Sequence, residues 1–149
     1  MENATDSDWW LEVAIPHILR TMYYRTVHGG VRVLDEDWDN FVILDACRYD
    51  MIVDADWHAD RVERRRSRGS NTPEFLQENF VGKDLLDTVY VTANPQVDVY
   101  LTDECYDLVS VWKTDWDDRL QTVPPDSVTR AAIDAHETYP RKRIVVHYM

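Results

Sequence analysis

Apolar and polar residues alternate along the chain in a way that predicts strands separated by helices. The continuous apolar run 41–44 is typical of a strand buried on both faces. Further strands are predicted at 61–67, 88–92, 108–112 and 143–148. Helices are predicted at 48–53, 72–80, 96–101 and 124–139. This alternation predicts an α/β fold with a mostly parallel sheet that carries helices on both faces.

The segment 8–28, which precedes this pattern, has apolar residues at helical spacing. Pro16 predicts either a kink or a division into two short helices, and the glycine pair that begins at Gly29 predicts the end of the segment. The segment is rich in tryptophan, so it could pack across the domain, lie on a membrane surface or bind a partner. We therefore divide the chain into an N-terminal helical segment, 1–34, and an α/β domain, 35–149.

The chain is strongly acidic, and this narrows its possible partners. It has 149 residues, the usual size of one domain, with 28 acidic and 16 basic residues and a formal net charge of −12. Such a charge argues against nucleic-acid binding, which needs a positive surface. Abundant Asp with few Lys indicates adaptation to high salt, where a Debye length of about 3 Å at 1 M screens self-repulsion. An ordinary acidic cytosolic protein is the alternative.

The cysteines and the hydropathy pattern indicate a soluble, cytoplasmic protein. Cys47 and Cys105 show no C-x-x-C spacing, so reduced thiols are expected rather than a disulfide framework. The sequence has no signal-peptide pattern and no run of about 20 apolar residues, so no membrane span is predicted.

Asp45 is the first candidate for chemistry, because it directly follows the apolar run 41–44. Ligands of open α/β sheets bind beyond the carboxyl ends of the strands. A carboxylate that leaves a buried strand needs a partner. Three interpretations remain open: Asp45 is a metal ligand, it caps the following helix, or it pairs with Arg48.

The second candidate is the hydroxyl-rich start of the helix predicted at 72–80. Ser70 and Thr72 lie where free backbone N–H groups and the helix dipole favour an anion. A hydroxyl at such a position can be activated by an adjacent metal and attack phosphorus or sulfur. Helix capping alone is the alternative. His147, on the last strand, could reach the same end of the sheet, or it could be an ordinary core or surface histidine.

Taken together, four segments resemble the alkaline phosphatase and sulfatase superfamily, in particular sulfatase-like proteins of salt-loving archaea. They are the first strand and its acidic turn, the hydroxyl-rich helix start, the second strand with its Asn-Pro turn, and the last strand: 40–50, 67–75, 87–95 and 145–149. The resemblance covers residues 39–149 and implies an alkaline-phosphatase-like fold.

The resemblance also implies a reaction and its residues. Asp45 matches a metal ligand, and the expected cofactor is a divalent cation such as Zn²⁺, Mn²⁺, Mg²⁺ or Ca²⁺. Thr72, or else Ser70, matches the nucleophile, while Arg48 and His147 would bind a phosphate or sulfate ester. Asn71 stands where a sulfatase has its modified cysteine, so phosphoryl transfer to Thr or Ser fits better than formylglycine chemistry.

The functional expectation also depends on Met149, the residue at which the sequence ends. By the resemblance, further metal ligands would lie beyond this residue, so the fold is expected to be incomplete at the C-terminus. The first hypothesis is therefore the N-terminal portion of a metal-dependent phosphate- or sulfate-ester hydrolase, completed by a complementary chain or a homo-oligomer. The alternative is a non-catalytic α/β domain that pairs with another chain through an open sheet edge or the Trp-rich helix.

Overall fold

A computed structural model describes residues 15–16, 18–19, 22, 29–55 and 61–149. Most of the helix predicted at 8–28 lies outside these residues. Before the first strand, the chain forms a short 3₁₀ helix, η3 (Val33–Asp35).

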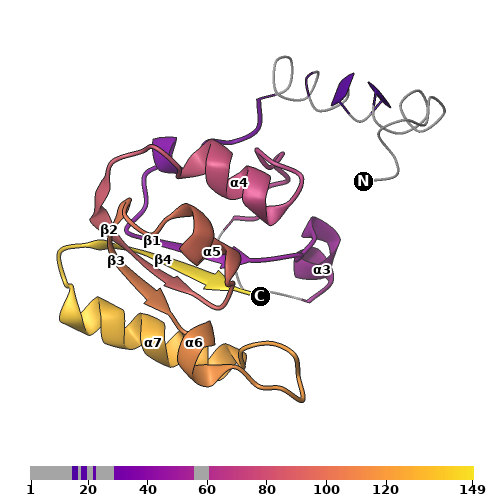
Figure 1. The fold of residues 1–149 in the computed structure, drawn as a ribbon. Coiled ribbons are helices and arrows are strands. Elements are labelled where there is room, and N and C mark those ends of the chain that lie inside the picture. The colour runs from indigo at the N-terminus through magenta and orange to yellow at the C-terminus, as the bar shows by residue number, and fades with distance from the viewer. Residues whose placement is uncertain (1–14, 17, 20–21, 23–28, 56–60) are drawn as a thin grey trace, which may run out of the picture.

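The described strands form one four-stranded sheet in which all neighbours are parallel. They are β1 (Asn40–Leu44), β2 (Leu85–Thr92), β3 (Cys105–Ser110) and β4 (Arg143–Tyr148). Their order is β1-β4-β2-β3, so the last strand along the chain lies between the first two (Figure 1). The predicted α/β class with a parallel sheet is confirmed.

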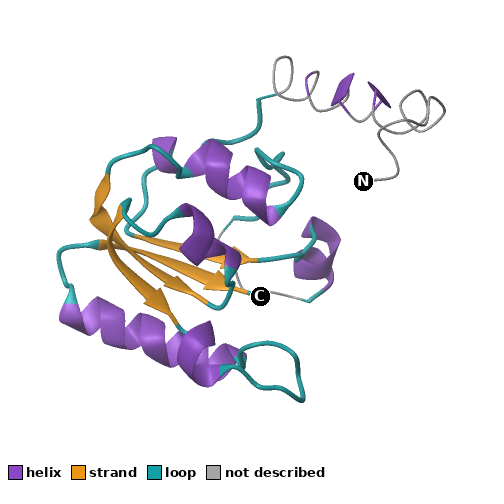
Figure 2. Cartoon of the chain, viewed as in Figure 1, coloured by secondary structure: helices purple, strands orange, loops and turns teal. Residues whose placement is uncertain are grey.

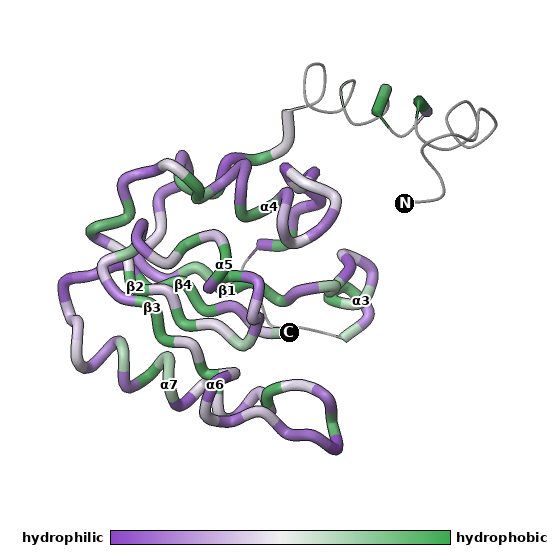
Figure 3. The backbone as a smooth tube through the Cα atoms, in the orientation of Figure 1, coloured by the Kyte–Doolittle hydropathy of each residue, from purple (hydrophilic) through white to green (hydrophobic). Residues whose placement is uncertain are grey.

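Helices lie on both faces of this sheet, as predicted. They are α3 (Tyr49–Asp54), α4 (Thr72–Asn79), α5 (Gln96–Tyr100), α6 (Trp112–Asp115) and α7 (Pro125–Thr138). Helices α4 and α5 cover one face, and α7 covers the other (Figures 1 and 2). Hydrophobic stretches follow the strands, whereas the loops are largely hydrophilic (Figure 3).

The alternation of side chains along β4 divides the core into two layers. Val145 is buried against α4 and α5 together with Leu76, Phe80, Tyr90 and other residues. Ile144 and Val146 point to the opposite face, where they pack in the cluster that includes residues of α7. Burial on both faces was predicted for the run 41–44, and that prediction is wrong, because β1 is an outer strand of the described sheet and leaves Val42 53% and Leu44 41% exposed. The strand with apolar residues buried on both faces is β4 instead.

Two strand predictions need correction. The segment 61–67 is no strand; within the described residues it forms a single isolated bridge, between Val31 and Ser67. Its arginines are exposed, and Arg65 forms ion pairs with Glu63 and Glu36. The side chains are therefore solvated or ion-paired, and the backbone does not form the hydrogen-bond ladder of a strand. The strand predicted at 108–112 is β3, Cys105–Ser110, and Trp112 instead begins α6.

The two outer strands have different edges. Within the described part of the chain, β1 pairs with β4 alone and its Val42 side chain is 53% exposed. On β3, the Asp107 carboxylate accepts the Leu108 backbone N–H at 2.9 Å and the Tyr139 hydroxyl at 2.7 Å. Strand β3 thus satisfies one of its edge donors with its own side chain.

No helix within the described residues has the length and apolar character needed to cross a membrane.

Asp98 of α5 joins this helix to the end of β3 and to α6. Its carboxylate accepts hydrogen bonds from Ser110 Oγ at 2.8 Å and Trp112 Nε1 at 2.7 Å, and it pairs with Lys113. Burial alone would raise the pKa of Asp98, but Lys113, Trp112 and Ser110 together hold it below the usual value.

We expect Asp98→Ala to lower the free energy of unfolding by about 2 kcal/mol at neutral pH, because several charge-assisted hydrogen bonds are lost. Since the pKa of Asp98 is lower in the folded state, its contribution is full above the unfolded-state value and is lost as the pH falls through the folded-state value. Urea unfolding at about pH 7 and about pH 3 should therefore show a smaller difference between variant and wild type in acid. Asp115→Ala, at an exposed residue of α6, is the matched control.

Candidate functional site

Three strands of the sheet end close together and bring polar side chains to one edge. Asp45 directly follows β1, His147 lies near the end of β4, and Asn94 follows β2 by two residues. Thr72 is the first residue of α4, and α4, together with α5, covers one face of the sheet (Figure 1). Because parallel strands end at the same edge, residues from distant parts of the chain form one cluster.

The Asp45 carboxylate is the centre of this cluster. Its Oδ2 accepts hydrogen bonds from Thr72 Oγ1 at 2.9 Å and from Asn94 Nδ2 at 3.2 Å. Its Oδ1 accepts the backbone N–H of Ala46 at 2.8 Å. These three hydrogen bonds hold the carboxylate in one orientation. The side chain is 32% exposed, so one side of it remains open to solvent.

Two of the three interpretations of Asp45 are wrong. The N-cap residue of α3 is Arg48, and no side chain caps that helix. Arg48 pairs with Asp50 rather than with Asp45. Asp45 precedes the N-cap of α3 by three residues, and its carboxylate accepts a hydrogen bond from Thr72 of α4 instead.

The backbone after β1 turns sharply to present Asp45 to the site. Ala46 has a φ of 60°, a left-handed conformation that costs a residue with a Cβ about 1 kcal/mol or more. The turn is fixed on both sides, since Asp45 N–H donates to Tyr148 O and Cys47 N–H donates to Leu44 O. The strained residue therefore sits next to the central carboxylate.

The polar residues at the start of α4 make different contacts. Asn71 is the N-cap and accepts the Glu74 N–H at 2.9 Å. Ser70 donates to the Glu74 carboxylate from both its backbone N–H, at 2.9 Å, and its hydroxyl, at 2.7 Å. Thr72 is the hydroxyl that reaches Asp45. Of the two predicted nucleophiles, Thr72 thus lies in the cluster and Ser70 lies in a capping arrangement.

His147 is buried beneath the cluster with an exposure of 1%. Its Nδ1 lies 3.0 Å from the Tyr90 hydroxyl, and its Nε2 lies 3.5 Å from Asp45 Oδ2. Burial lowers the pKa of His147 and outweighs the opposing charge of Asp45, so the imidazole is neutral at pH 7. Burial likewise raises the pKa of Tyr90 well above its usual value, which keeps the phenol protonated.

One predicted site residue, Arg48, lies outside the cluster, whereas Asn94 and Tyr90 lie in it without having been predicted. Arg48 is exposed and engaged with Asp50, away from the cluster. Asn94 and Tyr90 did not emerge from the sequence as site residues. Asn94 carries a usable signal, because it follows a predicted strand at the same edge as Asp45. Tyr90 carries none, because an aromatic residue within a buried strand is the usual core pattern.

The cluster offers two groups suited to a cation, the Asp45 carboxylate and the unpaired Nε2 of His147. Within the described residues, no group of three or more His, Cys, Asp or Glu side chains forms a metal site. The polar groups present fit a divalent cation in part, with one carboxylate, one imidazole and the neighbouring Thr72 hydroxyl.

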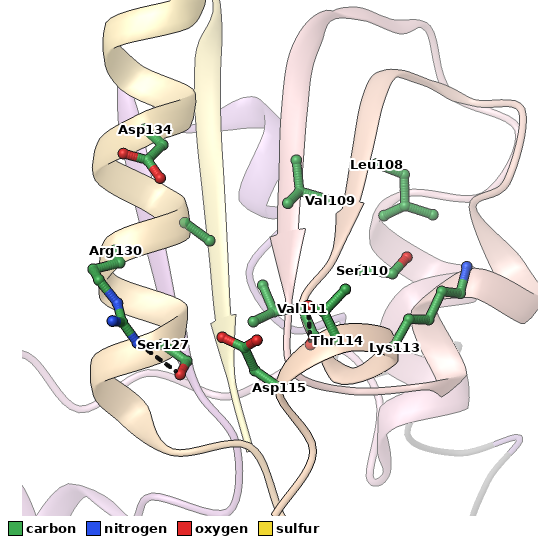
Figure 4. A pocket seen from close by; sticks show the side chains of 11 residues that line it. Leu108, Val109, Ser110, Val111, Lys113, Thr114, Asp115, Ser127, Arg130 and Asp134 are labelled. Atoms are coloured by element: carbon green, nitrogen blue, oxygen red, sulfur yellow. Dashed lines mark hydrogen bonds between the residues drawn. The ribbon is translucent and has the colours of Figure 1, made fainter.

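A separate pocket lies beside β3, between α6 and α7 (Figure 4). Its volume is about 480 Å³, and its lining includes Val109, Val111, Arg130 and Asp134. Arg130 donates to Ser127 across one wall at 3.1 Å. None of the Asp45 cluster lines this pocket.

The candidate site is therefore a hydroxyl held against a carboxylate, with a buried imidazole behind them. Such an arrangement can orient a nucleophile, accept its proton and bind a cation. Comparison of the chain with protein families, with curated proteins and with solved structures found no match.

Proposed function

We propose that this chain carries the nucleophile and a metal-binding carboxylate of a metal-dependent hydrolase that acts on phosphate or sulfate esters. The observation that supports the proposal most is the 2.9 Å hydrogen bond from Thr72 Oγ1 to Asp45 Oδ2. The two residues are far apart in the sequence, and a hydroxyl–carboxylate pair is what activation of an alcohol nucleophile requires.

In the proposed reaction, Thr72 Oγ1 forms a bond to phosphorus while the bond to the ester oxygen breaks, and that oxygen leaves as an anion that takes a proton from solvent. The proton of Thr72, which points at Asp45, passes to the carboxylate and from there to solvent. Water then hydrolyses the phosphothreonine and regenerates the hydroxyl. A divalent cation, when bound at Asp45, supplies Lewis-acid stabilisation of the negative charge on the transferring group.

One further feature favours an anionic substrate at this position, and a second orients the carboxylate. Thr72 begins an eight-residue helix, whose N-terminus favours negative charge. Asn94 donates to the same oxygen as Thr72 and so keeps the carboxylate oriented. Arg48 pairs with Asp50 at an exposed position, so the proposal gives it no contact with the reacting group.

We expect Asp45→Asn to reduce metal-dependent hydrolysis of an aryl phosphate by at least about 100-fold, because the variant lacks the charge that holds both the cation and the hydroxyl proton. The assay measures aryl alcohol release with Mn²⁺ or Zn²⁺ in high salt. Asp50→Asn, which removes a nearby exposed carboxylate, is the matched control and should retain the wild-type rate. Equal rates for wild type and Asp45→Asn would refute the proposed role of Asp45.

One observation favours a second candidate, a domain that pairs with another chain through β1. Val42 and Leu44 are 53% and 41% exposed on the α7 side of the sheet. Exposed apolar residues on an unpaired edge favour association. If so, Val42→Lys should shift sedimentation toward the monomer, whereas Leu86→Lys, at a residue outside β1, should not. A wild-type chain that sediments as a monomer at all concentrations would exclude pairing of the chain with itself.

A further inference from the structure

The buried imidazole of His147 has one ring nitrogen with no hydrogen-bond partner. Among the described residues, nothing donates to or accepts from Nε2 within hydrogen-bond geometry, although the residue is only 1% exposed. A buried polar atom without a partner destabilises the folded state, because it has lost its hydrogen bonds to water. Such atoms are rare in folded proteins and call for an explanation such as a bound ion.

The other ring nitrogen is firmly held, so the ring is oriented. Nδ1 lies 3.0 Å from the Tyr90 hydroxyl, and Tyr90 itself is fully buried. Phe80 packs edge-on against Tyr90, with 5.5 Å between the ring centroids. Tyr90 and its packing therefore direct Nε2 toward Asp45 at the sheet edge.

We propose that His147 Nε2 and Asp45 Oδ2 together bind one divalent transition-metal ion, with zinc as the best fit. This inference rests on the proposed function and assigns His147 to the metal rather than to the substrate. Zinc lies about 2.0–2.2 Å from imidazole nitrogen and carboxylate oxygen in a tetrahedral arrangement, so two of its ligands are about 3.4 Å apart. The observed separation of Nε2 and Oδ2 is 3.5 Å.

Magnesium suits this pair of atoms less well. Its octahedral geometry at about 2.1 Å puts neighbouring ligands about 3 Å apart, and it prefers oxygen ligands and retained water. An imidazole nitrogen in the donor set therefore favours zinc over magnesium.

The surrounding hydrogen bonds are compatible with this assignment. A metal-binding Nε2 carries no proton, so Nδ1 carries it and donates to the Tyr90 oxygen. Thr72 and Asn94 both lie within hydrogen-bond distance of Oδ2 and keep the carboxylate in place. The Thr72 hydroxyl lies close enough to Asp45 to become a further ligand, which would connect the metal directly to the proposed nucleophile.

Zinc titration of the full chain, followed by ¹⁵N NMR of the histidines, tests the proposal directly. We expect zinc to shift the Nε2 resonance of His147 and to leave that of His136, on α7, unchanged. This readout needs no variant and no enzymatic activity. Zinc binding that leaves His147 unshifted, or the absence of zinc binding at millimolar concentration, would overturn the proposal.

Calorimetric titration of variants gives a second readout. His147→Gln and Asp45→Asn should each weaken zinc binding by at least about 10-fold, whereas His136→Gln should not. Tyr90→Phe keeps the packing of the ring but removes the partner of Nδ1, and it should weaken zinc binding by about 10-fold or more. Magnesium affinity should respond less to His147→Gln than zinc affinity does, because magnesium prefers oxygen.

The two proposals can fail separately. If His147→Gln binds zinc as tightly as wild type while Asp45→Asn does not, the metal role of His147 is refuted and the carboxylate site remains. If zinc shifts His147 but no phosphoryl group ever appears on Thr72, the metal site stands and the proposed hydrolase reaction falls.

Discussion

Replacing Thr72 with valine is expected to reduce the rate of aryl phosphate hydrolysis by at least about 1,000-fold, because valine has nearly the same shape as threonine but no hydroxyl. The variant loses the Oγ1–Oδ2 hydrogen bond, while Asn94 still donates to Asp45. The position of the carboxylate should therefore change little. The decrease in rate therefore measures the loss of the nucleophile and not a rearrangement of the site.

Thr72→Ser is the matched variant, since it keeps a hydroxyl at the same helix position. We expect it to retain activity within about 10-fold of wild type. Ser70→Ala tests the other predicted nucleophile and should affect helix stability more than rate, because Ser70 bonds to Glu74. A Thr72→Val variant with the wild-type rate, combined with an inactive Ser70→Ala variant, would transfer the nucleophile role to Ser70.

The covalent step offers a measurement that is independent of turnover. Acid quenching during incubation with an aryl phosphate should trap a phosphoryl group on the peptide that contains Thr72, detectable by its mass. The same peptide from Thr72→Val should remain unmodified. Modification that persists in Thr72→Val would place the acceptor at another residue.

The second large effect is expected in the core, where Phe80→Ala should lower the free energy of unfolding by about 3–5 kcal/mol. Phe80 is fully buried and makes edge contacts with Phe75 and Tyr90, at centroid distances of 5.9 Å and 5.5 Å. Truncation leaves a cavity next to Tyr90 and removes two aromatic contacts. Guanidinium unfolding followed by circular dichroism measures the loss.

Leu86→Ala is the control for this substitution, because Leu86 is 62% exposed and should change stability by less than about 0.5 kcal/mol. Phe80→Leu should fall between the two, since it fills most of the volume. Because Phe80 supports Tyr90, the Phe80→Ala variant should also loosen His147. A drop of less than about 1 kcal/mol would show that the two aromatic neighbours close the cavity.

The sequence predicts the layers of this fold because its strands are marked by strong apolar runs. Both 41–44 and 143–148 are strands as predicted, but the strand covered on both faces is β4 and not β1, because β4 lies between two strands and β1 lies at the edge of the described sheet. The segment 61–67 misled because an exposed edge strand can carry charged residues, although its charges argue against a strand. Its arginines form ion pairs, which no local pattern reveals. The order of the strands also depends on contacts between distant segments.

The candidate site was predictable where it depends on strand ends and helix starts. Asp45 and Thr72 each occupy such a position, and they lie together in the structure. The hydrogen bond from Ser70 to Glu74, which separates Ser70 from Asp45, depends on rotamers that the sequence does not determine. The partnership of Tyr90 with His147 depends on which side chains of β2 and β4 are neighbours, and that follows only from the strand order.

The unequal edges of the sheet limit how copies of this protein can assemble. Asp107 occupies the Leu108 donor on β3, while β1 leaves its edge unpaired among the described residues. Growth of a sheet from molecule to molecule needs two receptive edges on every copy, since each must join a neighbour on both sides. Because the Leu108 donor of β3 is already engaged, β1 is the more receptive of the two described edges. A contact through β1 alone would join two molecules into a closed pair, whereas a fibre would also need the edge of β3.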